Sequence, residues 1–161
     1  SLVAVAALAA CGGAGARTAV TLCSGTQLKA TFNVVRGSAG AGNIVYRLSV
    51  TNISTTECGL TGSPVVRLYS KTGKALPTHV KPVFRPGLLA PLVRLKPGMS
   101  AHATARFSPD VPGVGEPTSG TQCEPTAATI RVSGSAKAPV KPATPVCEHG
   151  TLQMSVYQYG K

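Results

Sequence analysis

Apolar and polar residues alternate most clearly in the stretch 43–52, which predicts a β-strand with one buried face. The apolar members lie two residues apart and polar residues separate most of them: Ile44, Tyr46, Leu48 and Val50 against Arg47, Ser49 and Thr51. A period of two is that of a half-buried strand. A polar loop containing Cys58 follows, and Pro64 then opens a β-branched run, where proline is tolerated because a first strand position need not donate a hydrogen bond. The stretch therefore predicts a strand, a cysteine-bearing turn and a second strand.

Similar short runs recur along the chain and predict further strands at 28–34, 92–95, 101–107, 129–133 and 152–156. Pro97-Gly98 predicts a turn between paired strands. Segments 77–91, 108–125 and 134–145 show no strand pattern and are expected to be connections, of which 108–125 is long enough to be functional or mobile. Eighteen glycines and thirteen prolines favour many short elements joined by turns. We predict an all-β fold, an antiparallel immunoglobulin-like β-sandwich of about seven strands.

Residues 1–11 predict a targeting segment and are excluded from the fold. The ten residues before Cys11 are small or apolar; they are too few for a transmembrane helix, which needs about 20, but suit the hydrophobic region of a signal peptide. Residues 8–11, Leu-Ala-Ala-Cys, resemble the bacterial lipobox, whose cysteine receives a diacylglyceryl group. We predict lipidation at Cys11, with ordinary secretion and cleavage near Ala10 or Ala16 as the alternative. The expected organisation is a signal-peptide remnant at 1–11, a flexible tether at 12–22 and a β-sandwich domain at 23–161.

Four further cysteines, Cys23, Cys58, Cys123 and Cys147, predict two disulfide bonds in an exported chain, with three possible connectivities. The absence of a Cys-x-x-Cys sequence disfavours zinc binding and thioredoxin-type chemistry. In an immunoglobulin-like sandwich the first and last strands can run side by side in parallel, which brings their starts together. We therefore pair Cys23 with Cys147, and Cys58 with Cys123 by elimination. Strand counting places the second pair at opposite ends unless the 108–125 loop crosses over.

Several short motifs together resemble a known family. They are Cys23 with Leu28, Leu48-x-Val50-Thr51-Asn52, Cys58-x-Leu60-x-Gly62-x-Pro64-x-Val66, Leu95-x-Pro97-Gly98-x-Ser100-Ala101, and the pair Cys123 and Cys147. Over about residues 23–157 the chain resembles the secreted actinobacterial family called domain of unknown function 4232. The resemblance implies an exported, often lipid-anchored, disulfide-bonded β-sandwich, and it carries over no catalytic residue. The strongly basic balance of this chain departs from the family.

The net charge of +11 arises from sixteen Lys and Arg against five acids. The basic residues are spread singly along the sequence, whereas a nucleic-acid footprint is usually a patch or stripe, so we expect no nucleic-acid partner. A broad positive potential attracts polyanions, and the expected partners are anionic envelope polymers or an acidic protein, with membrane contact through the lipid anchor only. Loops 77–91 and 108–125 are the candidate contact surfaces, and Lys81 and Arg85 in the first are the candidate binding residues.

The candidate catalytic groups are scattered. His79, His102 and His149 form no His-x-x-x-His pair, the acids are isolated, and no Gly-x-Ser-x-Gly occurs, so we predict no metal site, no cofactor and no catalytic set. We predict an exported, lipid-anchored, non-enzymatic module for binding or interaction at the cell envelope, extracytoplasmic and either membrane-anchored or secreted. The alternatives are a secreted envelope hydrolase, which would use His79 or His102 with an acid such as Asp110, and an unanchored secreted structural protein.

Overall fold

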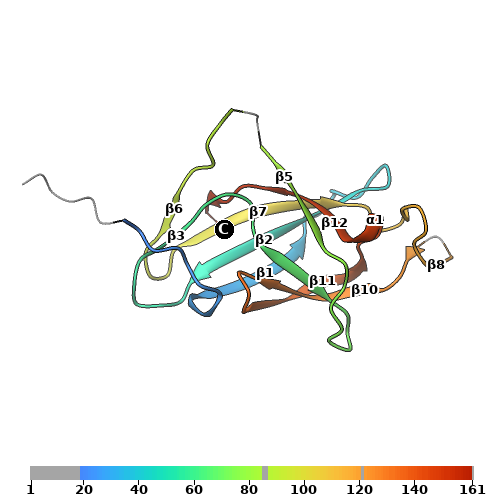
Figure 1. Ribbon diagram of the computed structural model, residues 1–161, viewed down its shortest axis with the longest axis horizontal. Coiled ribbons are helices and arrows are strands. Elements are labelled where there is room, and N and C mark those ends of the chain that lie inside the picture. The colour runs from blue at the N-terminus through green and yellow to red at the C-terminus, as the bar shows by residue number, and fades with distance from the viewer. Residues whose placement is uncertain (1–18, 85–86, 121, 161) are drawn as a thin grey trace, which may run out of the picture.

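The computed structural model describes residues 19–84, 87–120 and 122–160 as an all-β domain with short helical turns (Figure 1). Its elements in chain order are η1 (Gly25–Gln27), β1 (Leu28–Val34), β2 (Ile44–Asn52), β3 (Cys58–Leu60), β4 (Val66–Tyr69), β5 (His79–Val83), β6 (Val93–Leu95), β7 (Ser100–Phe107), β8 (Thr118–Ser119), β9 (Gln122–Cys123), β10 (Thr126–Val132), β11 (Ala136–Pro145), α1 (Cys147–Gly150), β12 (Thr151–Ser155) and β13 (Gln158–Tyr159). The expected all-β, disulfide-bonded class is confirmed.

The main sheet is one hydrogen-bonded path in the order β4-β10-β11-β1-β2-β7-β12-β5, with β13 paired to β7 beside it. It curls around the core in Figure 1, and β3–β6 and β8–β9 form two small separate sheets. The path runs without a break from β4 to β5, so the two separate sheets of an immunoglobulin-like sandwich are not confirmed. The β1–β11 and β12–β5 pairs are parallel, which makes the sheet mixed, whereas the expected antiparallel sandwich had its parallel contact between the first and last strands.

The alternation read from the sequence is realised in β1 and β2. Leu28, Ala30 and Phe32 of β1 are buried while the residues between them are exposed, and the apolar residues of β2 from Tyr46 to Val50 face the same core. The rings of Phe32 and Tyr46 lie 5.1 Å apart, and the Tyr46 hydroxyl donates a 2.7 Å hydrogen bond to the Pro142 carbonyl. Each large apolar side chain buried in this way contributes roughly 1.5–3 kcal/mol, so this face holds the sheet to its core.

The segment 134–145, expected to be a connection, instead contains the ten-residue strand β11. Its prolines argued against a central strand because proline donates no ladder hydrogen bond. The strand changes partners along its length: residues 136–139 and 144–145 pair with β10, whereas Val140 and Lys141 pair with β1, and Pro142 lies in neither ladder. Ala136, Ala138 and Val140 alternate as buried residues, which is the signal that the prolines masked.

The turn at Pro97-Gly98 is confirmed, but the strands on either side of it do not pair with each other. Met99 donates a backbone hydrogen bond of 2.9 Å to Lys96, and Gly98 has a φ of +79°, which favours glycine. β6 pairs with β3, whereas β7 pairs with β2. The turn therefore carries the chain from the small sheet into the main one.

Both predicted disulfide pairings are wrong. The structure joins Cys23 to Cys58, with Cα atoms 4.9 Å apart, and Cys123 to Cys147, with Cα atoms 5.6 Å apart. The prediction assumed that the first and last strands are neighbours, but β1 lies parallel to β11, and β12 lies parallel to β5. The chain before β1 runs beside β3 instead, where the Cys23 backbone donates to the Gly59 carbonyl at 2.9 Å.

The predicted lipidation site Cys11, the predicted targeting segment 1–11 and most of the predicted tether at 12–22 lie outside the described residues. At the near end of the described chain, Leu22 forms an isolated parallel bridge with Gly59. The ordered domain thus includes Leu22, one residue before the boundary expected from Cys23. The described residues contain no helix long and apolar enough to cross a membrane.

Candidate functional site

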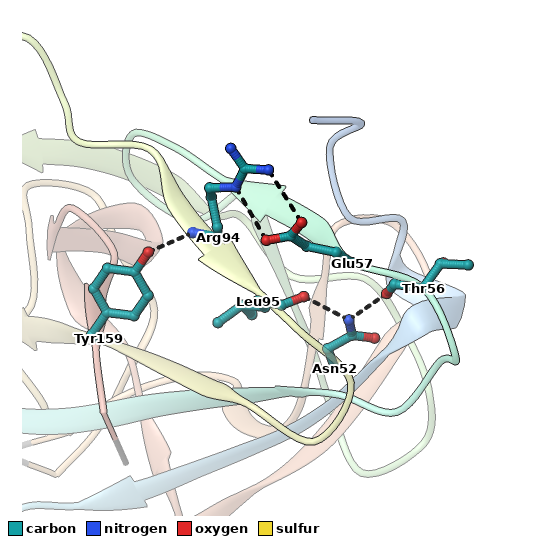
Figure 2. Close-up of polar contacts among 6 residues, drawn as sticks. All are labelled: Asn52, Thr56, Glu57, Arg94, Leu95 and Tyr159. Carbon is teal, nitrogen blue, oxygen red and sulfur yellow. Dashed lines mark hydrogen bonds and ion pairs between the residues drawn. The ribbon is translucent and has the colours of Figure 1, made fainter. Parts of the chain in front are cut away.

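Asn52, at the end of β2, is the centre of a buried hydrogen-bond network (Figure 2). Its side-chain amide donates to the carbonyls of Thr56 and Leu95 at 2.7 and 2.9 Å, and its oxygen accepts from the backbone and hydroxyl of Ser54. Its backbone accepts from Gly98 and donates to Met99. This one residue therefore ties together the end of β2, the loop before β3, the end of β6 and the turn before β7.

Beside this network, Glu57 and Arg94 form an ion pair on the surface (Figure 2). Arg94 Nε and Nη2 each donate to one carboxylate oxygen of Glu57 at 3.1 Å, and these hydrogen bonds hold the pKa of Glu57 below its usual value. The hydroxyl of Tyr159 accepts from the Arg94 backbone at 2.9 Å, which ties β13 to β6. The three residues border a hollow of about 500 Å³. Glu57 neutralises Arg94, but a further cation, Lys96, also borders this hollow.

The two candidate binding residues in 77–91 are not both described. Lys81 is exposed in β5, an edge strand that pairs with β12, and Arg85 lies outside the described residues. The expectation of an irregular connection is therefore wrong for 79–83. After β5 the chain projects at the top of Figure 1 and exposes Phe84, Leu88 and Leu89, the last by 97%. Within its described residues this connection offers apolar surface and the single cation Lys81.

The second candidate surface, 108–125, is held against the domain at several points. It contains the β8–β9 hairpin and Cys123, which is linked to Cys147. The carboxylate of Glu116 accepts backbone hydrogen bonds from Gly113 at 2.5 Å, Glu148 at 2.8 Å and His149 at 2.5 Å. The expectation that this stretch is structureless is thus wrong.

Glu116 is a fixed anchor because its charge is stabilised by the backbone. Desolvation raises the pKa of its carboxyl group, but the three backbone N–H donors together outweigh desolvation and lower the pKa below its usual value. Glu148 and His149 have φ values of 54° and 57°, in the left-handed region, where their N–H groups converge on the carboxylate. Such a concave group of N–H donors favours an anion, and here the protein supplies the anion itself.

The histidines do not assemble with Asp110 into a catalytic set in the described residues. His102 lies in β7 opposite Ser49, and Asp110 follows the far end of that strand. The five residue-to-residue steps from His102 to Phe107 span about 16 Å of strand. His79 lies in β5 opposite Thr151, and the His149 ring is hydrogen-bonded to the Val114 carbonyl at 3.1 Å. No hydrogen bond joins Asp110 to His79 or His102 in the described parts of the chain, and no group of three or more His, Cys, Asp or Glu there has the geometry to hold a metal.

Charge is distributed unevenly between the sheet and the loops. The strands of the main sheet contain no Asp or Glu, but they carry Lys29, Arg47, Arg67, Lys81, Arg106, Arg131, Lys137 and Lys141. All five acids lie in other segments. Where buried residues alternate with them, as around Lys29, Arg106 and Lys137, these cations point away from the core. The outer face of the sheet is therefore cationic, although the sequence shows no basic cluster, because strand pairing brings distant single residues onto one surface.

These features define the class as a small, all-β domain stapled by two disulfides, which indicate an oxidising, extracytoplasmic environment. The chain belongs to the family described as Domain of unknown function (DUF4232), whose sequence profile matches residues 23–158. No curated protein and no solved structure was found to match the chain.

Proposed function

We propose that this chain is a non-enzymatic module of the cell envelope that binds an anionic partner through the outer face of its sheet. The observation that carries the proposal is the segregation of charge: the main sheet bears cations and no acid. Like charges on one face repel one another, so a surface of this kind favours a polyanionic partner that neutralises them. The partner is an anionic envelope polymer or an acidic protein.

The proposal also places the chain at the membrane through a diacylated Cys11, because the residues before it suit an export signal ending in a lipobox. A diacylated cysteine supplies the two acyl chains that stable anchoring requires. We infer that the curled sheet is a variant of the immunoglobulin-like sandwich, since both ends of its strand path contribute to a single buried core. Comparing Cys11→Ala with the full-length precursor in detergent partition tests the anchor: release of the variant into the aqueous phase supports it, and identical partition refutes it.

Binding is tested on the Cys11→Ala chain with immobilised inorganic polyphosphate, and with poly-L-lysine as a cationic control. We expect retention on polyphosphate that weakens steeply with NaCl, because the screening length falls to about 10 Å at 0.1 M salt. No retention on poly-L-lysine is expected. Retention on polyphosphate that does not change between low and high salt would reject the electrostatic basis of the proposal.

The candidate loop is tested separately by reversing the charge at Lys81 and Arg85. If that loop contributes, Lys81→Glu with Arg85→Glu weakens retention while thermal unfolding stays nearly unchanged, because Lys81 is exposed at a sheet edge. The enzyme alternative makes a different prediction. Hydrolysis of a cell-wall substrate that is lost in His102→Ala would replace the binding module with a hydrolase.

A further inference from the structure

The cations of the sheet are densest where three neighbouring strands carry one each at the same level. Arg131 of β10 lies directly opposite Arg67 of β4 on one side and directly opposite Lys137 of β11 on the other. Arg67 and Lys137 are exposed and Arg131 is half-buried. We call these three residues the basic row. None of the three strands contains an acid to offset them.

The basic row is costly to the fold and is held in place. Like charges directly opposite each other on neighbouring strands are destabilising. The guanidinium of Arg131 nevertheless lies 4.6 Å from the centre of the Tyr69 ring, a cation–π contact that restricts its orientation. An arrangement that costs stability and fixes a central guanidinium over an aromatic ring is better suited to a ligand than to the free protein.

The surface around Arg131 is hollowed on both sides. One hollow of about 350 Å³ is bordered by Arg67, Tyr69 and Arg131. A second, of about 170 Å³, is bordered by Tyr69, Lys71, Arg131 and Lys137. Both hollows are bordered by Tyr69 and Arg131, so they adjoin along the basic row, and we call the two together the groove.

We propose that this groove binds a linear polymer with repeated phosphate groups; the inference rests on the proposed binding of anionic partners and identifies their chemistry and site. Neighbouring strands lie about 4.8 Å apart, so the basic row spans about 10 Å. One phosphate group carries at most about two negative charges, fewer than the three cations of the basic row, whereas successive groups of a chain can neutralise all three. The arginine forks bind phosphate oxygens in pairs, and lysine binds phosphate as a point charge.

The test compares two triple variants that lose the same charge, both in the Cys11→Ala chain with fluorescently labelled inorganic polyphosphate. The site variant carries Arg67→Gln, Arg131→Gln and Lys137→Gln. The control variant carries substitutions at three exposed cations outside the basic row and outside the candidate loops: Lys29→Gln, Arg36→Gln and Arg106→Gln. Affinity is measured over a series of NaCl concentrations.

We expect the site variant to lose about tenfold or more in affinity at low salt. The slope of log K against log salt should fall by about 2, since each cation paired with a flexible polyanion contributes about 0.7. The control variant should lose less than about threefold. Arg131→Lys keeps the charge but removes the planar fork, so it should weaken affinity with little change of slope.

Arg67→Gln with Lys137→Gln, which keeps the Arg131 contact with Tyr69, should keep or raise the melting temperature, because it removes like charges that face one another. A clear fall would show that the basic row stabilises the fold and would overturn the argument for a ligand. If the parent chain itself binds no polyphosphate, the proposed function fails together with this site. If the parent binds and both variants weaken alike, the proposed function stands and this site is wrong.

Competitors identify the ligand chemistry. Orthophosphate should compete only weakly, and competition equal to that of polyphosphate would overturn the requirement for a chain. Poly-L-glutamate binding as tightly as polyphosphate would overturn the choice of phosphate. If vesicles of phosphatidylglycerol bind the parent but not the site variant, the groove binds phosphate, and the phosphate groups that it binds are those of lipid headgroups.

Discussion

Replacement of Asn52 tests whether the network at the end of β2 holds the small β3–β6 sheet to the main sheet. Its amide donates to the carbonyls of Leu95 and Thr56, and the Leu95 bond is buried. Asn52→Ala leaves both carbonyls without that donor. An unsatisfied buried polar group costs about 1–3 kcal/mol, whereas the Ser54 groups can turn to water and are counted as little. Because the Thr56 carbonyl also accepts from the Ser54 hydroxyl at 3.0 Å, we expect Asn52→Ala to lower the free energy of unfolding by about 1–3 kcal/mol, mainly from the Leu95 carbonyl.

Asn52→Asp separates hydrogen bonding from the filling of space. It preserves the shape and the acceptor for Ser54, but it turns the donor into a second acceptor that faces the Thr56 and Leu95 carbonyls. At neutral pH we expect it to destabilise at least as much as Asn52→Ala. If Asn52 merely filled its site, the isosteric aspartate would be the milder change.

Urea unfolding followed by circular dichroism measures both variants, since the chain has no tryptophan to report by fluorescence. The dependence on urea should keep its slope, which would show that stability alone has changed. Asn33→Ala is the matched control, because Asn33 is exposed on the neighbouring strand β1, and it should change stability by no more than about 0.5 kcal/mol. If the free energy of unfolding of Asn52→Asp lay within about 1 kcal/mol of the parent's, which is the scale of one hydrogen bond, the role assigned to the Asn52 amide would be refuted.

Two further predictions concern the crosslinks and the anchored loop. Peptide mapping without reduction should recover Cys23 joined to Cys58, and a peptide joining Cys23 to Cys147 would contradict the strand order. Replacing both Cys23 and Cys58 by serine should lower the free energy of unfolding in urea by about 4 kcal/mol, from the chain entropy of a 35-residue separation. The lowered pKa of Glu116 means that its contribution to stability is present above the unfolded value of 4.5 and is lost as pH falls through the lower folded value. The protection factor for amide exchange at His149, which corrects for the intrinsic pH dependence of exchange, should therefore fall in acid in the parent and be low at every pH in Glu116→Gln. A high protection factor in that variant would show that the carboxylate does not hold the turn.

The sequence predicted those strands in which one face is strongly apolar. In β1 and β2 large apolar residues alternate with polar ones, so the period of two was visible. In β11 the alternating buried positions are Ala136, Ala138 and Val140, and Pro139 and Pro142 stand at exposed positions. Alanine gives a weak hydrophobic signal and proline is a strong signal for a turn. The pattern was present in β11, but the residue types concealed it.

Strand neighbours, and whatever depends on them, could not be read from the chain. The cysteine pairing failed because it required knowing which strand lies beside β1, and the sequence contains no local signal for a partner such as β11. The basic row was missed for the same reason. Arg67 and Arg131 are 64 positions apart in the sequence, and each occupies a polar position of its own strand, so neither suggested a cluster.

The motifs that pointed to the family lie in the scaffold, which limits what family membership can say about a ligand. Asn52 bonds to Leu95 and Gly98, and the Thr51 hydroxyl lies 2.8 Å from that of Ser100, so these motif residues hold one another. The basic row lies outside every one of those motifs. Membership of the family therefore accounts for how the chain folds, whereas the partner must be inferred from the outer face of β4, β10 and β11. A family member that has the motifs but lacks these cations is therefore not expected to bind the ligand proposed for the basic row.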